Sequence, residues 1–108
     1  MIDGAPSYVR FPAIFTPIIE GDRVTRQIGV SITLELVKGQ EKDDVEAQRL
    51  RINDAFVTDL YAFFQQRASI HTIDEEYLKG RLLKVAANVT GKNVVRQVLI
   101  QQLFEQPK

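Results

Sequence analysis

Few residues in this chain have the types and spacing that metal binding or redox chemistry needs. The sequence has one histidine, His71, and no cysteine, which excludes thiolate metal sites and disulfides. A lone histidine needs carboxylate help to hold a transition metal, and no carboxylate here has the spacing to give it. We therefore interpret His71 as a solvated loop residue and predict no metal site.

The carboxylates gather in two short runs, at 41–44 and at 74–76. Each run lies where a helix is expected to begin, and the helix dipole stabilises negative charge there. A calcium loop would alternate oxygen ligands around a glycine, whereas Gly39 precedes the first run. Asp54 would lie on the polar face of its helix and Asp59 at the edge of the apolar one. This arrangement favours an ordinary helix surface over paired acid–base chemistry.

No motif for nucleotide binding or nucleophilic catalysis is present. The glycines form neither a phosphate-binding loop nor a dinucleotide fingerprint, and no serine lies in a nucleophile elbow. Basic and acidic residues number 14 each, so no net charge indicates a nucleic-acid or anionic-membrane partner. The sequence predicts a protein that is not an enzyme and binds no cofactor.

The order of apolar residues predicts two strands before residue 38. In 8–19, apolar residues alternate with others, but Pro12 and Pro17 remove backbone donors, so this strand is expected to lie at an edge or to be interrupted. Residues 24–37 form the clearest strand, with one apolar and one polar face. The apolar face consists of Ile28, Val30, Ile32, Leu34 and Leu36.

From about Asp44 the apolar period changes to 3.6 residues, which predicts an amphipathic helix that ends before 68–71. One row is expected to face the sheet and consists of Val45, Ile52, Phe56, Leu60 and Phe63. A second row widens the apolar arc to about half the circumference. Because a sheet alone cannot cover so wide an arc, the second row is the candidate interface with another helix or subunit. It consists of Leu50, Val57, Tyr61 and Phe64.

A second amphipathic helix is expected after residue 71. It begins either with a capping box from Thr72 to Glu75 or with Asp74 as N-cap, and it ends near Gly91. Its apolar stripe consists of Leu78, Leu82, Val85 and Val89. Gly80 lies inside this helix, where glycine costs about 1 kcal/mol that close packing can offset.

Residues 94–104 are apolar on both faces and predict the most buried strand. The predicted organisation is an extended lead-in over 1–7, a single domain over 8–104 and a polar tail over 105–108. The fold class is α+β in the order β-β-α-α-β. A small, predominantly antiparallel sheet of about three strands is expected to carry a helical hairpin on one face, with the last strand antiparallel to the second.

Four segments resemble the FliL family of flagellar basal-body-associated proteins. The segment 26–36 resembles the family's long second strand, and 51–56 resembles its Ile-Arg-Asp-Ala helix, with Asn53 in place of arginine. The segment 74–83 resembles the start of the second helix. The segment 94–101 resembles the closing strand, although Ile100 and Gln101 replace the usual Phe-Thr. The resemblance spans residues 8–102.

The resemblance implies a fold similar to that of stomatin and other SPFH domains. It implies a periplasmic domain of a single-pass inner-membrane protein that forms homo-oligomeric rings around the flagellar stator and supports motility, swarming and surface sensing. The family's N-terminal transmembrane helix has no counterpart here, because no run approaches the ~20 apolar residues of a membrane span. The family supplies no catalytic residues to carry over.

Two other functions remain open. The first is an SPFH-like adaptor for a different membrane complex. The second is a small-ligand-binding or catalytic domain that uses the space between sheet and helices, although the sequence shows no convergent polar groups for it. For the isolated chain we expect a monomer or weak oligomer, because a membrane anchor would raise the effective concentration of the subunits.

Overall fold

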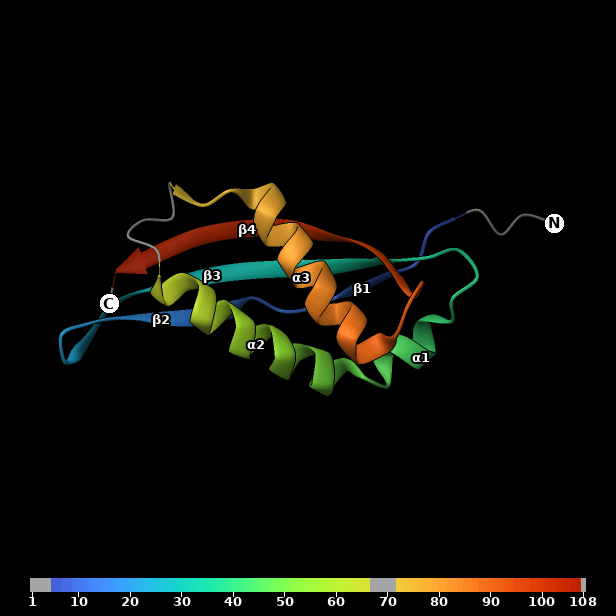
Figure 1. Ribbon diagram of the computed structural model, residues 1–108, viewed down its shortest axis with the longest axis horizontal. Helices are drawn as coiled ribbons and strands as arrows, with labels where there is room; N and C mark the ends of the chain where they lie inside the picture. Colours follow the sequence, from blue (N-terminus) through green and yellow to red (C-terminus); the bar gives the residue numbers. More distant parts are fainter. Residues whose placement is uncertain (1–4, 67–71, 108) are drawn as a thin grey trace.

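The computed structural model describes residues 5–66 and 72–107 of the chain. Within these residues the fold is α+β, with four strands and three helices (Figure 1). The order along the chain confirms the predicted β-β-α-α-β class, with the first strand and the first helix each divided in two. The elements are β1 (Tyr8–Arg10), β2 (Ile14–Glu20), β3 (Arg23–Leu36), α1 (Lys42–Glu46), α2 (Arg49–Gln65), α3 (Glu75–Thr90) and β4 (Val95–Pro107).

The strand β3 is the centre of the sheet, and all of its pairings are antiparallel. It pairs with β4 along one edge and with β1 and β2 along the other. The strands β1 and β2 follow one another along the same edge, with Pro12 in the gap between them. Phe11 bridges this gap by donating its backbone N–H to the carbonyl of Ile32 at 2.9 Å. The expectation of an interrupted edge strand is therefore confirmed.

One face of the sheet carries the core, and the helices cover that face (Figure 1). The alternate β3 residues from Ile28 to Leu36 are at most 1% exposed, as the apolar alternation predicts. The opposite face carries the polar alternate residues of β3 and an aromatic pair. The ring of Phe104 covers Gly29 and meets the ring of Phe15, which is 46% exposed, edge-on with centroids 5.8 Å apart.

The continuous helix expected from Asp44 is instead two helices. The first, α1, ends at Glu46, and Gln48 leaves helical geometry at φ −103° and ψ 11° before α2 begins. Val45 is still buried at 1% exposure, in the helix that contacts β1. The break therefore changes the path of the chain without exposing the apolar row.

Two contacts fix α2 across the strands β1 and β2. Near its middle, Phe56 packs edge-on against Phe11, with ring centroids 5.6 Å apart. At its end, Gln65 donates Nε2–H to the carbonyl of Pro17 at 2.8 Å. The helix is therefore held at both places to the same edge of the sheet.

The helix α3 begins at the second of the two N-caps that the sequence allowed. The carboxylate of Asp74 accepts the backbone N–H of Glu76 at 3.0 Å and that of Tyr77 at 3.2 Å. The helix ends at Gly91, whose φ of +101° is a conformation that glycine tolerates. Its buried residues are Leu78, Leu82 and Ala86.

The last strand differs from its prediction in burial and in length. Only Val98 of β4 is buried, because β4 pairs with β3 alone among the described residues and forms an edge of the sheet. The polar tail expected from residue 105 continues the strand to Pro107. Glu105 accepts a hydrogen bond from Arg26 at 3.1 Å, and Gln106 accepts one from Gln27 at 3.0 Å. Because these polar side chains have partners on β3, the strand β4 continues through them to Pro107.

Candidate functional site

Three of the four candidate interface residues lie exposed on α2. Leu50 is 79% exposed, and Val57 and Tyr61 are each 43% exposed. At about 100° per residue these three side chains fall within about 40° of one another on the helix. We call them the α2 stripe. Since α2 buries its other apolar row against the sheet, the stripe is apolar surface that this chain does not cover itself.

The fourth candidate, Phe64, does not lie on the surface. It is fully buried and packs edge-on against Phe63, with ring centroids 5.3 Å apart. Phe64 is rotated by about 60° from Tyr61 toward the buried row. The hydrogen bond from Gln65 to Pro17 holds this end of α2 against β2, so the intervening ring is enclosed in the core.

The two long helices, α2 and α3, are joined by a partly buried ion pair. Arg81 donates its Nε–H to Asp59 Oδ2 at 2.7 Å, and its guanidinium lies 5.2 Å from the centroid of the Phe63 ring. The Asp59 carboxylate, aided by Tyr77, raises the pKa of Arg81 above its ordinary value. The Asp59 carboxylate therefore serves to join the helices.

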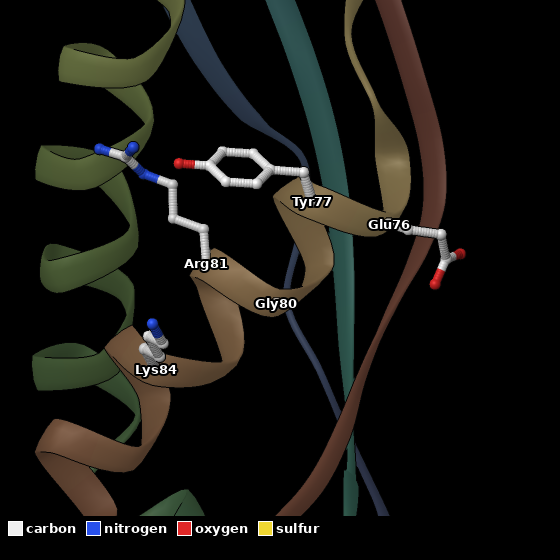
Figure 2. A pocket seen from close by; sticks show the side chains of 5 residues that line it. All are labelled: Glu76, Tyr77, Gly80, Arg81 and Lys84. Atoms are coloured by element: carbon white, nitrogen blue, oxygen red, sulfur yellow. The ribbon is translucent and has the colours of Figure 1, made fainter.

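A shallow groove of about 270 Å³ lies on α3 beside this ion pair. Figure 2 shows Tyr77 and Arg81 extending from α3 toward α2, with Glu76 pointing the other way. Tyr77 is 55% exposed, and its ring stacks on Phe63 with centroids 6.1 Å apart. The groove is lined by Glu76, Tyr77, Gly80, Arg81 and Lys84, and we call it the α3 groove.

Gly80 forms the floor of the α3 groove. No atom lies within 4 Å of the place that a β-carbon on Gly80 would take, so packing within the described chain does not require glycine there. The close packing that was expected to offset this glycine is therefore absent inside the chain. The sequence marked Gly80 as costly and, by its spacing, places it on one helix face with Tyr77 and Lys84, but it did not show that this face is exposed.

A second polar cluster lies on the uncovered face of the sheet, where Glu35 is 8% exposed. Gln97 donates a hydrogen bond to Glu35 Oε1 at 2.8 Å, and Arg96 donates one to Oε2 at 2.6 Å. Together they lower the pKa of Glu35 from its ordinary value of 4.5, against the opposing effect of burial. Both oxygens of the Glu35 carboxylate accept hydrogen bonds from side chains of the neighbouring strand β4, which indicates a structural role.

The remaining carboxylates do not assemble into a site in the described residues. Asp74 caps α3, Asp59 holds Arg81, and Asp54 lies exposed on α2. Over residues 5–66 and 72–107, no three histidine or acidic side chains are grouped closely enough to hold a metal ion. His71 lies outside the described residues.

A scan against protein-family models and a search of the curated proteins find no match for this chain. Among the helices that the structure describes, none has the length and apolar character to cross a membrane.

Proposed function

We propose that this chain is a non-enzymatic scaffold domain that acts by binding further copies of itself and a membrane complex, in the manner of the periplasmic FliL domain. The observation that carries the proposal is the α2 stripe, because Leu50, Val57 and Tyr61 stay exposed on a helix whose other face is fully packed. Exposed apolar residues grouped on one face are typical of association surfaces.

Two further observations support this proposal. The order of strands and helices is the one that the resemblance to FliL implies. In addition, Glu35, Asp59 and Glu105 each pair with a cation on a neighbouring element and hold the two elements together. On this proposal the oligomer is a ring, its partner is the flagellar stator, and the domain lies in the periplasm on an inner-membrane anchor.

The test is a motility assay in the source bacterium. We expect deletion of the gene to reduce swarming, and Val57→Glu to reproduce that loss because a carboxylate disrupts the apolar surface. Thr58→Glu is the matched control, since Thr58 is the neighbouring exposed residue on α2 and lies outside the stripe. Swimming and swarming that survive deletion unchanged would rule out a role at the stator.

A further inference from the structure

The α2 stripe and the α3 groove each contain a charged side chain without an ionic partner. On α2, Asp54 lies between Leu50 and Val57 along the stripe and is exposed. On α3, Lys84 is exposed at one end of the groove. Neither Asp54 nor Lys84 forms an ion pair with any residue in 5–66 or 72–107. An unpaired acidic side chain therefore lies beside the stripe, and an unpaired basic side chain lies in the groove.

The two surfaces also have the same length. Asp54 and Tyr61 are seven positions apart on α2, and Lys84 and Tyr77 are seven positions apart on α3, about 10.5 Å along each helix. In antiparallel order Val57 and Gly80 lie between these ends, at positions that differ by one residue, or about 1.5 Å along the helix axis. When two such helices lie antiparallel, Asp54 faces Lys84, Val57 lies over Gly80, and Tyr61 lies beside Tyr77.

Gly80 supplies the space for this contact. Helices pack at axial distances of 8–10 Å, and the residues at the contact set where in that range they fall. A position without a side chain lets the facing Val57 approach the backbone of α3. Gly80 is exposed, and no atom of the described chain lies within 4 Å of the place of its β-carbon, so this side of α3 is open to a second molecule.

We propose that the α2 stripe of one copy docks antiparallel in the α3 groove of a second copy. This inference rests on the self-association in the proposed function and adds the surface that receives the stripe. Both surfaces belong to the same helical layer of one chain, so the contact forms between copies. It is heterologous, because one copy contributes the stripe and the next contributes the groove. Contacts of this type propagate, and they close into a ring where the rotation between copies permits.

Disulfide trapping tests the contact directly, because the native chain has no cysteine. Tyr61→Cys and Tyr77→Cys, two exposed positions that the proposed contact places side by side, are introduced in separate chains with different tags, mixed, and oxidised. We expect a cross-linked dimer that carries both tags, while each variant alone stays monomeric. The control pair is Thr58→Cys with Asn88→Cys, two exposed positions that the proposed contact places too far apart for a disulfide.

Two results would overturn the inference. The first is a mixed dimer that forms no faster than the control pair. The second is rapid cross-linking of Tyr61→Cys with itself, which would mean that the stripe of one copy meets the stripe of another. That second result would leave the proposed self-association standing, so the two proposals fail separately.

A charge exchange gives an independent readout by sedimentation. We expect Asp54→Lys and Lys84→Asp each to weaken self-association severalfold, and the variant with both changes to restore it. If the single variants associate as well as the native chain, the inference that Asp54 of one copy faces Lys84 of the other is overturned.

Discussion

Asp59 of α2 and Arg81 of α3 form a hydrogen-bonded ion pair, with Arg81 Nε 2.7 Å from Asp59 Oδ2. Their side chains are only 20% and 32% exposed, and the guanidinium also lies on the ring of Phe63. This pair connects the helix that carries the α2 stripe to the helix that carries the α3 groove. It therefore sets how the two candidate surfaces are oriented relative to each other.

Removing the charge of Asp59 is expected to loosen this connection. Asp59→Asn keeps the shape of the side chain, and we expect it to lower the free energy of unfolding by about 1 kcal/mol in urea denaturation. Asp54→Asn is the matched control on the same helix, because Asp54 has no ionic partner in the described chain. Equal losses in the two variants would show that the ion pair contributes nothing specific.

The candidates Phe64 and Tyr61 are expected to respond differently to truncation. Phe64→Ala removes a fully buried ring, and we expect a loss of about 3–5 kcal/mol in stability. Tyr61→Ala removes a ring that is 43% exposed, and we expect a loss below about 1 kcal/mol. Thermal or urea unfolding measures both. A loss at Tyr61 as large as that at Phe64 would place Tyr61 in the core and exclude it from the α2 stripe.

Glu35 is expected to make the fold sensitive to acid. Because its pKa is lowered in the folded chain, the unfolded chain binds more protons as the pH falls below about 4.5. The stabilisation from Glu35 is thus complete above that pH and is lost as the pH falls through the folded pKa. We expect Glu35→Gln to flatten this part of the stability–pH curve. If Glu35→Gln loses stability in acid as the native chain does, residues other than Glu35 cause the acid sensitivity.

Gly80→Ala is expected to separate stability from association. A β-carbon at residue 80 meets no atom of its own chain and improves helix propensity, so we expect a gain of about 1 kcal/mol. The same methyl group occupies the floor of the α3 groove and should weaken self-association. Unfolding and sedimentation on one sample measure both effects. A variant that is more stable and associates normally would contradict the role given to Gly80.

The sheet could be predicted because its signals are local. The apolar residues of β3 alternate from Ile28 to Leu36, and a period of two assigns each side chain to a face without knowledge of its neighbours. The prolines that interrupt the first strand also act locally, by removing a donor. By contrast, the burial of β4 depends on which strands pair with it. Its apolar residues predicted a central strand, but β4 has one partner in the described chain and lies at an edge.

The candidate site was predictable only in part, because its members are selected by contacts distant in sequence. Phe64 and Tyr61 were assigned to one apolar row, and the contact of Gln65 with Pro17, 48 residues away, holds the end of α2 at which Phe64 is enclosed. Gly80 was conspicuous as a glycine within a helix, and its spacing from Tyr77 and Lys84 places the three residues on one helix face. That this face is exposed depends on how α3 packs in the fold.

The central claim is that Leu50, Val57 and Tyr61 form a surface for association, and its most direct test restores the effective concentration that an anchor gives. Donor- and acceptor-labelled copies are attached by their N-termini to lipid vesicles at increasing density. For the native chain we expect energy transfer to exceed that of a non-associating protein at equal density. With all three residues changed to serine, transfer should fall to that reference level while the unfolding midpoint is retained. Energy transfer that is identical in the native and the triple-serine chains would contradict the claim.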